Sequence, residues 1–334
     1  MSKKKIHIRG AGIAGLWQAL TLARRGHDVT VAERSPEPFG AACSAYAGGM
    51  LAPYCEEESA EPMIRDLGLR SIALWRETYP ETRAAGSLVV TQPRDRRELD
   101  RYARMTEAHE RVNGNRIGDL EPELADRFSV ALFYSQEAHV VPGPALSFLL
   151  DAARAAGADL RFGDEATDIK ADWTIDCRGL AARDALPELR GVRGERLLIR
   201  TEEVHLERPV RLLHPRFPIY VVPWDDGLFM VGATQIESEE AHAVSVRSAL
   251  ELLSTAYALH PAFGEAEIVE FGAGVRPAFP DNLPRVVVNG SEIYVNGLFR
   301  HGFLLAPALA ELVAAHVDEG ASHPEVFVEN RPER

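Results

Sequence analysis

The order of apolar and polar positions near the start of the chain predicts a strand, a helix and a second strand. Residues 6–9 and 29–32 are short β-rich runs, while residues 13–25 carry apolar side chains at the three- and four-residue spacing of a helix. Gly26 marks the end of that helix, and the second strand stops at Glu33. The rest of the chain is organised around this βαβ unit.

The same spacings predict further elements along the chain. Helices are expected at residues 61–79, 95–111, 145–156, 245–260 and 303–317. Strands are expected at residues 86–91, 130–133, 159–162, 173–177, 197–201, 210–213, 219–222, 228–232, 268–271 and 293–295. Turn signals such as Asp225-Asp226-Gly227 separate the strands between 197 and 271, which is typical of a mixed or antiparallel sheet.

This order of elements favours an α/β protein with two domains. We expect a Rossmann-type nucleotide-binding domain built from both chain ends, residues 1–80, 130–200 and 270–334. A substrate-binding domain with a mixed or antiparallel sheet and helices, residues 81–129 and 201–269, is inserted into it. His7 and Arg9 interrupt a first strand that is normally buried on both faces, so we expect a polar neighbour to cover it.

Three glycines stand between the first strand and the helix in the spacing G-x-G-x-x-G. Gly10 permits a tight turn, Gly12 lets the backbone approach a pyrophosphate, and Gly15 lets helix and strand pack closely. The helix start offers unpaired N–H groups and a positive dipole end to phosphates. Glu33, which follows Gly10 by 23 residues, can accept the hydroxyl hydrogens of an adenosine ribose. The unit therefore predicts a dinucleotide site, and it leaves NAD and FAD as alternatives.

A loop of small residues follows at 40–51, with the sequence GAACSAYAGGML. Such a loop can lie against a flat ligand because few side chains would clash with it. A flexible connector would have the same composition, so both interpretations stay open here.

Composition and charge exclude several classes of function. The 334 residues are 46% hydrophobic with a net charge of −13, which disfavours extended contact with nucleic acid or an anionic membrane. No apolar run reaches 18 residues and no signal core is present, so a cytoplasmic protein is expected. Cys43, Cys55 and Cys177 lack metal-like spacing, and neither a structural disulfide nor a metal site is expected.

Longer motifs give the chain a resemblance to the FAD-dependent D-amino-acid oxidase, glycine oxidase and sarcosine oxidase family, above all to the glycine oxidase of thiamine biosynthesis. The matching segments are RGAGIAG with Glu33, AYAGGMLAP at 45–53, VRGE at 192–195, YVVPWDDGLFMVGAT at 220–234, GVRPAFPDNLP at 274–284 and GLFRHGFLLAPA at 297–308. They span nearly the whole chain in the same order. The resemblance implies FAD rather than NAD.

The resemblance also implies roles for three side chains. Arg276 matches the arginine that clamps the substrate carboxylate, a task suited to a planar guanidinium. Tyr220 matches a tyrosine whose hydroxyl binds the same carboxylate, and Arg300 matches a second arginine near the mouth of the site. Taken alone, Arg276 and Arg300 could be ion-paired groups, and Tyr220 could be a core residue bonded to backbone. His301 is not expected to act as a base, because hydride transfer from a free amine needs none.

The residues implied to contact FAD come from six parts of the chain. They are Gly10, Gly12, Ile13, Ala14, Gly15, Glu33, Arg34, Ser44, Gly48, Gly49, Met50, Leu51, Cys177, Gly179, Arg276, Gly297, Arg300, Gly302, Phe303 and Leu304. Relatives that attach flavin covalently use a cysteine in the C-terminal half. This chain has none after Cys177, so FAD is expected to be held non-covalently.

The implied activity is oxidation of the amine of glycine or a similar small amino acid to the imine, with O₂ reduced to H₂O₂. A role in thiamine biosynthesis and a possible homo-oligomer are part of the same expectation. The chain departs from the family in three places: a short segment at 162–173, where a hairpin over the adenine is expected to be missing, Cys177 in place of alanine or serine beside the nucleotide, and Gln235 in place of an apolar residue near the substrate. The last departure leaves the substrate open. The alternatives are an oxidase or dehydrogenase for larger D-amino acids, a flavin-binding partner in a tRNA-modifying assembly, and an NAD-dependent dehydrogenase.

Overall fold

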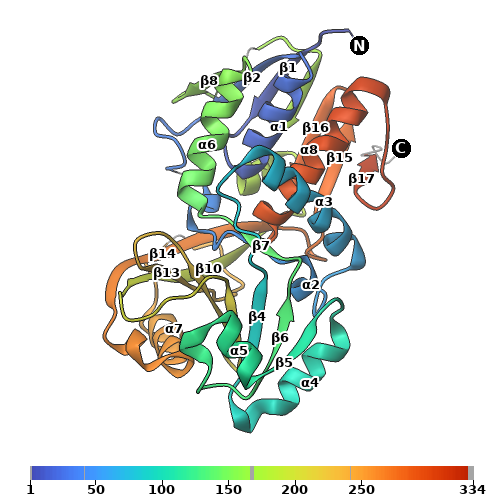
Figure 1. The fold of residues 1–334 in the computed structure, drawn as a ribbon. Coiled ribbons are helices and arrows are strands. Elements are labelled where there is room, and N and C mark those ends of the chain that lie inside the picture. The colour runs from blue at the N-terminus through green and yellow to red at the C-terminus, as the bar shows by residue number, and fades with distance from the viewer. Residues whose placement is uncertain (1, 41, 166–168, 241, 330–334) are drawn as a thin grey trace.

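Two β-sheets, each with its own helices, make up the protein (Figure 1). The computed structural model describes residues 2–40, 42–165, 169–240 and 242–329. One sheet has seven strands and the other eight, and a two-stranded ribbon of β3 (Met50–Leu51) and β7 (Ala138–His139) lies between them in the chain's path.

The seven-stranded sheet joins the two ends of the sequence. Its strands, in spatial order, are β17 (Phe327–Glu329), β15 (Arg285–Asn289), β16 (Glu292–Asn296), β9 (Trp173–Asp176), β1 (Lys5–Arg9), β2 (Asp28–Glu33) and β8 (Asp159–Phe162). All neighbours are parallel except β15 and β16, which form an antiparallel hairpin. Only β9 separates β16, from the C-terminal part of the chain, from β1 at the N-terminus. The sequence predicts that both chain ends join one sheet.

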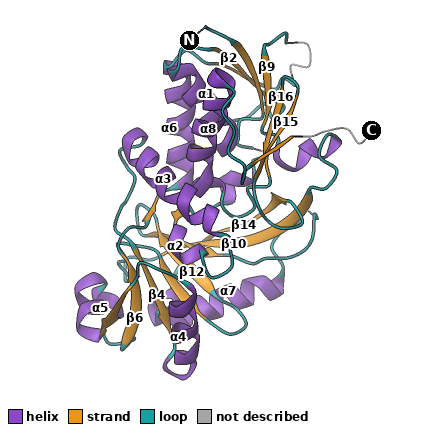
Figure 2. Cartoon of the chain, turned by 90° about the vertical axis from the view of Figure 1, so that its right-hand side faces the viewer, coloured by secondary structure: helices purple, strands orange, loops and turns teal. Residues whose placement is uncertain are grey.

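Four long helices cover one side of this sheet (Figure 2). They are α1 (Ile13–Arg24), α3 (Pro62–Thr78), α6 (Pro142–Ala155) and α8 (Gly302–Glu319). Ile6 and Ile8 of β1 are buried in one apolar core with residues of these helices. The indole of Trp75 on α3 donates a hydrogen bond of 2.8 Å to the carbonyl of Phe303 and stacks on its ring, which fixes the start of α8.

The polar residues of β1 lie among charged groups of neighbouring strands. His7 is 3% exposed, and burial, followed by the positive charges of Arg9 and Arg161, lowers its pKa. Arg9 lies 3.6 Å from the carboxylate of Asp176 on β9. These charges lie beside β1 in the sheet and its surroundings, and a polar neighbour that covers the strand stays a prediction.

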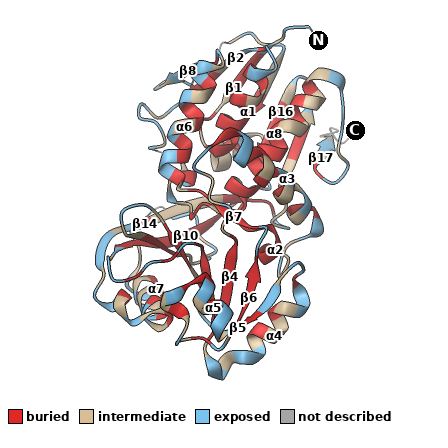
Figure 3. Cartoon of the chain, in the orientation of Figure 1, coloured by how far each residue is buried: buried red, intermediate tan, exposed pale blue. Residues whose placement is uncertain are grey.

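The eight-stranded sheet is mixed. In spatial order its strands are β14 (Glu267–Ala278), β10 (Arg190–Arg200), β13 (Leu228–Gly232), β12 (Ile219–Pro223), β11 (Val210–Leu213), β4 (Ser87–Thr91), β6 (Val130–Tyr134) and β5 (Glu110–Asn113). Only β11 and β4 run parallel. α7 (Val246–Leu259) and α5 (Gly114–Leu120) pack on one face, and α4 (Arg96–Met105) and α2 (Pro53–Glu56) on the other. Buried side chains concentrate in the strands between these layers (Figure 3).

Short 3₁₀ turns complete the described chain. They lie at Cys43–Tyr46, Pro93–Asp95, Pro122–Leu124, Gly179–Asp184 and Pro261–Gly264.

The division of the chain into two domains stays a proposal. Strand pairing places β6 and β10 in the eight-stranded sheet, although residues 130–200 were expected to belong with the nucleotide-binding part.

The predicted helix at residues 95–111 is wrong over its last part. α4 ends at Met105, Thr106 is extended, and Ala108 has a positive φ of 53°. The next residues form β5, in which Val112 is buried between exposed neighbours. β5 has only one buried side chain and lies within a charged run. The sequence there shows no alternation of apolar and polar residues that would indicate a strand. The strands β3, β7, β15 and β17 and helices α2 and α5 were not predicted, and β10 and β14 are longer than predicted.

Candidate active site

A cavity of about 1200 Å³ is lined by residues of both sheets. Its walls come from the start of α1, the end of β2, the loop at 40–56, the turn after β9, strands β12 and β14, and the start of α8. The C-terminal ends of parallel strands meet at such an edge, which is where ligands bind in open α/β sheets.

The glycine turn of the first βαβ unit has the geometry that its spacing predicts. Gly10 has a φ of +96°, and a Cβ there would lie 2.8 Å from the carbonyl oxygen of Cys177. A Cβ on Gly15 would lie 1.9 Å from the carbonyl oxygen of Gly10, so no side chain is possible where α1 meets the turn. Gly12 lines the cavity. The atom nearest to a Cβ added at Gly12 would be Ser44 Oγ, at 3.7 Å. The backbone is therefore open to a ligand at Gly12.

Glu33 is fixed at the end of β2, with its side chain at the cavity wall. One carboxylate oxygen accepts the Ala11 amide at 2.9 Å, and the other accepts the Ser35 amide at 3.0 Å. Each carboxylate oxygen has two acceptor positions. Glu33 can therefore still accept hydroxyl groups from a ligand in the cavity.

The small-residue loop has defined structure over its described residues, 40 and 42–51; residue 41 lies outside the described residues. It forms a 3₁₀ turn at Cys43–Tyr46, and β3 pairs with β7. Gly49 has a φ of +75° and would place a Cβ 2.0 Å from the carbonyl oxygen of Val140, while a Cβ on Gly48 would lie 2.6 Å from Met230 Cε. The glycines are required because the loop is pressed between the two sheets. Its Ser44 hydroxyl is buried without a hydrogen-bond partner in the described structure and faces the cavity lining.

Arg276 and Tyr220 lie together in the same cavity. Arg276, on β14, is partly buried, and burial lowers the pKa of its guanidinium, which nonetheless stays charged in proteins. One of its nitrogens donates to the carbonyl of Thr234 at 3.2 Å. The Tyr220 ring on β12 lies against Gly48, and its hydroxyl has no hydrogen bond to another described residue. Both groups thus retain donors for a ligand.

Arg300, whose side chain is 33% exposed, belongs to a charge network around the buried Glu56 that the sequence did not predict. Glu56, on α2, accepts Arg300 at 2.7 Å, His301 Nε2 at 2.9 Å and Arg211 at 3.0 Å. Burial alone would raise the pKa of Glu56, but Arg300, His301 and Arg211 together hold it well below its usual range. Arg300 also donates to the hydroxyl of Ser59 at 2.7 Å. All three of the Glu56 partners line the cavity, so the network fixes one of its walls.

Comparison with known proteins identifies the chain. The family described as FAD dependent oxidoreductase (DAO) matches residues 5–316. This protein belongs to that family. It is 51% identical over 323 residues to a protein of Rhizobium etli named as the thiamine biosynthesis oxidoreductase ThiO, and the match covers 96% of this chain and 98% of that one.

Glycine oxidases are also among the relatives of this FAD-dependent oxidoreductase. The glycine oxidase of Geobacillus kaustophilus is 28% identical over 354 residues, which cover 94% of this chain and 92% of that protein. The crystal structure of that enzyme superposes with a TM-score of 0.82 over 98% of this chain and 99% of its own, at 23% identity. The expected α/β fold is therefore confirmed.

The residues present fit FAD. The open backbone at Gly12, the Glu33 carboxylate and the unpartnered Ser44 hydroxyl are complementary to a pyrophosphate, a ribose and a further acceptor. α8 begins at Gly302 with its first residues at the cavity, so its positive dipole end is directed at a ligand there. These groups would hold the dinucleotide non-covalently. No helix among the described residues is long and apolar enough to cross a membrane.

The structure brings most of the expected FAD-contacting residues together. The cavity is lined by Gly10, Gly12, Ile13, Ala14, Glu33, Arg34, Ser44, Gly48, Gly49, Met50, Cys177, Gly179, Arg276, Arg300, Gly302, Phe303 and Leu304. Gly15, Leu51 and Gly297 do not line it. Gly15 and Gly297 permit close packing, against Gly10 and Phe279 respectively, and Leu51 is buried in the core of the helical layer. These contacts position the turns, and a contact of the three residues with FAD stays a prediction.

Several cavity residues carried no predicted role. Glu56 stood in an acidic run that resembled a solvated surface, and Arg211 stood in an ordinary strand. Arg193 and Thr234 lay inside recognised motifs without an assigned function, as did Glu195, which is buried beside Arg193 and does not line the cavity. β10 is buried along almost its whole length. The alternation of polar and apolar residues within 190–200 therefore does not show which charged side chains are buried.

Proposed function

We propose that this FAD-dependent oxidoreductase oxidises the amine of glycine, or of a similarly small amino acid, to the imine. The observation that supports it most strongly is Arg276: a partly buried guanidinium that faces a cavity and has only one hydrogen-bond partner among the described residues. A charge held this way is suited to a carboxylate, which accepts two parallel N–H bonds from arginine. Bound FAD supplies the hydride acceptor and transfers the electrons to O₂, giving H₂O₂.

The roles of the chain's own residues follow from their places in the cavity. Arg276 binds the carboxylate and Tyr220 adds a hydrogen bond from its hydroxyl. These two contacts orient the amino acid so that its Cα faces the loop at Gly48 and Met50. The hydrogen on Cα leaves as hydride while the amine of the amino acid is neutral. No side chain therefore has to remove it as a proton.

A role in thiamine biosynthesis is part of the proposal. It is supported by the name of the Rhizobium etli relative, which matches this chain over nearly its full length. Complementation of a thiamine auxotroph that lacks its glycine oxidase tests it. Growth without thiamine is expected, and growth only with added thiamine contradicts the role.

One observation favours a second candidate, oxidation of larger D-amino acids. The cavity lining extends beyond the loop at Gly48 to Gln235, after β13, and to Arg247 and Leu252 on α7. This part of the cavity offers room for the side chain of a larger amino acid. Gln235 also replaces the apolar residue common in the family. This alternative shares the carboxylate site and differs only in the preferred substrate.

Anaerobic reduction of the purified holoenzyme decides between these functions. A panel of glycine, sarcosine, D-alanine and D-proline is added under nitrogen, and the loss of the oxidised flavin absorbance is followed. We expect glycine to bleach the flavin fastest. Faster bleaching by D-alanine or D-proline supports the second candidate, and no bleaching by any of them contradicts both.

Self-association and a cytoplasmic location remain proposals. Both are supported only by the resemblance to the family. Light scattering of the holoenzyme and fractionation of cells test them, and a monomer or a membrane-associated protein would contradict them.

A further inference from the structure

The described residues of the segment between β13 and α7, 234–240 and 242–245, are bound to β10 at several points. The Arg193 amide donates to the carbonyl of Ile236 at 2.8 Å, and the Ile236 amide donates back at 2.9 Å. The Thr234 amide donates to the carbonyl of Glu195 at 3.1 Å, while the Glu195 amide donates to the Thr234 hydroxyl at 2.9 Å. Thr234 is therefore fixed to β10 by both its backbone and its side chain.

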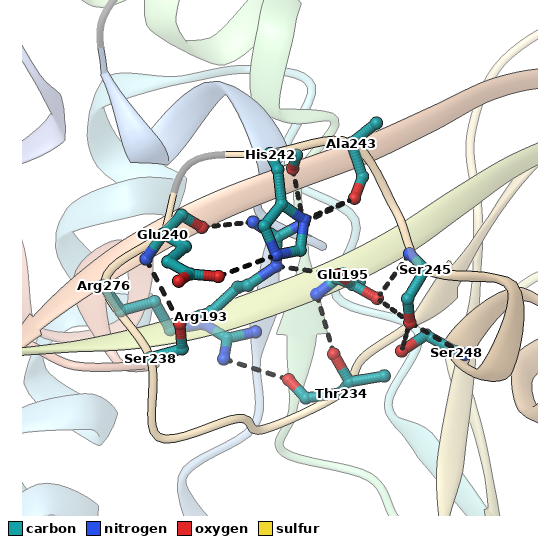
Figure 4. Close-up of polar contacts among 10 residues, drawn as sticks. All are labelled: Arg193, Glu195, Thr234, Ser238, Glu240, His242, Ala243, Ser245, Ser248 and Arg276. Atoms are coloured by element: carbon teal, nitrogen blue, oxygen red, sulfur yellow. Dashed lines mark hydrogen bonds and ion pairs between the residues drawn. The ribbon is translucent and has the colours of Figure 1, made fainter.

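A buried ion pair holds the rest of this segment. Arg193 and Glu195 have side chains that are 1% and 0% exposed, and their Nε and Oε1 atoms are 2.7 Å apart. The remaining Arg193 nitrogens donate to the carbonyls of Glu240, His242 and Ala243, as Figure 4 shows. Because each strongly polar group has a partner, this pair can be buried without an isolated charge.

Glu195 also anchors the end of the segment. Its second oxygen accepts the amide and the hydroxyl of Ser245, both at 3.3 Å, at the N-cap of α7. Burial alone would raise the pKa of Glu195, but hydrogen bonds from Ser248, Arg193 and Ser245 hold it below its usual value. The carboxylate is thus ionised and joins β10 to the Ser245 end of the segment, while the backbone amide and carbonyl of Glu195 hold the Thr234 end.

The segment contacts Arg276 through one atom. The carbonyl of Thr234 accepts Arg276 Nη1 at 3.2 Å (Figure 4). On its other side the guanidinium lies over Gly194, where an added Cβ would be 2.1 Å from Nη2. The Arg276 guanidinium therefore lies against Gly194, between Arg193 and Glu195 in the sequence. Its orientation is fixed by the carbonyl of Thr234, which the backbone of Glu195 holds in place.

We propose that Thr234, held by the backbone of Glu195 on β10, is a positioning residue that sets the orientation of the Arg276 guanidinium and so the affinity for a substrate carboxylate. The inference rests on the proposed function, in which Arg276 binds that carboxylate. Arginine has five N–H donors, and one bond to Thr234 leaves enough for a bidentate contact. An arginine fixed before binding loses less side-chain freedom when the ligand arrives.

The test compares Thr234→Val with Thr234→Ser in the holoenzyme. Valine keeps the shape of threonine but removes the acceptor of the Glu195 amide, whereas serine retains it. Acetate, a carboxylate without an amine, is titrated and its Kd is read from the flavin spectrum. The KM for glycine and the limiting rate of anaerobic flavin reduction are measured beside it.

For Thr234→Val we expect the Kd for acetate and the KM for glycine to rise by roughly 3- to 10-fold, as for one side chain that must be ordered on binding. The limiting reduction rate and the FAD affinity stay within about twofold of wild type, and Thr234→Ser restores carboxylate affinity. A wild-type Kd for acetate in Thr234→Val overturns the inference, as does a loss confined to the limiting rate.

A second variant serves if Thr234→Val does not fold. Gly194→Ala places a Cβ against the Arg276 guanidinium, and it is expected to weaken acetate binding with little change in FAD affinity. Unchanged acetate binding there overturns the inference. A wild-type enzyme that binds no acetate and is reduced by no amine contradicts the proposed function, and the inference with it. A functional wild type with unaffected variants contradicts the inference alone.

Discussion

Replacing Glu56 by glutamine tests how strongly the buried charge network stabilises this fold. Glu56 is 9% exposed and accepts Arg300, His301 and Arg211 at 2.7, 2.9 and 3.0 Å. Glutamine has one acceptor oxygen and directs an NH₂ group at the same cations. Removing one member of a buried ion pair typically costs about 3–5 kcal/mol, and the remaining acceptor offsets part of that. We expect the free energy of unfolding to fall by about 2–4 kcal/mol at pH 7.

Thermal unfolding of the apoprotein measures this loss. An unfolding entropy of about 2.1 cal/mol/K per residue corresponds to about 0.7 kcal/mol/K for 334 residues. The expected decrease in Tm is therefore about 3–6 °C. Glu58→Gln is the matched control, because Glu58 pairs with Arg101 at a partly exposed site and should change stability by less than about 1 kcal/mol.

The pH dependence gives an independent check. The folded pKa of Glu56 lies well below its ordinary value of 4.5, so its stabilisation is complete above pH 4.5 and is lost as the pH falls toward the folded pKa. The difference in Tm between wild type and Glu56→Gln should be constant from pH 7 to 5 and shrink below pH 4.5. An equal Tm at pH 7, or a difference that persists unchanged at pH 3.5, refutes the reasoning.

Three further substitutions test individual parts of the site. Arg276→Ala should lower kcat/KM for glycine at least about a hundredfold in steady-state assays while FAD stays bound, because charge-assisted bonds to the carboxylate are lost; normal turnover removes Arg276 from the site. Glu33→Ala should raise the Kd for FAD about 10- to 100-fold in fluorescence titrations of the apoprotein, and an unchanged Kd would show that the ribose is bound elsewhere. Gly15→Ala should lower the Tm of the apoprotein because its Cβ would meet Gly10 at 1.9 Å, whereas Gly12→Ala should keep the Tm and weaken FAD binding. Equal Tm values for these two variants would contradict the packing role of Gly15.

Features encoded within a short stretch of sequence were predictable. The turn at Gly10, Gly12 and Gly15 and the acid at Glu33 depend on local backbone conformation and spacing, and the structure places them as expected. The loop at 40–51 was ambiguous, because its order depends on Val140 and Met230, which are distant in sequence.

Buried charge networks could not be predicted for the same reason. Glu56 finds its partners 155 and 245 residues away, at Arg211 and His301. Glu195 bonds to Ser245, 50 residues away. In the sequence each of these residues resembles a solvated charge, and only the folded chain shows that the charges are paired and buried. The helix predicted at 95–111 failed because the sheet provides a partner for residues 110–113 that local spacing does not reveal.

The central claim is that this FAD-dependent oxidoreductase removes hydride from a small amino acid held by its carboxylate. Anaerobic addition of glycine to the yellow holoenzyme tests it most directly. The account predicts that glycine bleaches the oxidised flavin, that O₂ restores the absorbance with one H₂O₂ per flavin, and that Arg276→Ala with FAD bound is not bleached under the same conditions. A wild-type flavin that stays oxidised with every amino acid of the panel would contradict the account.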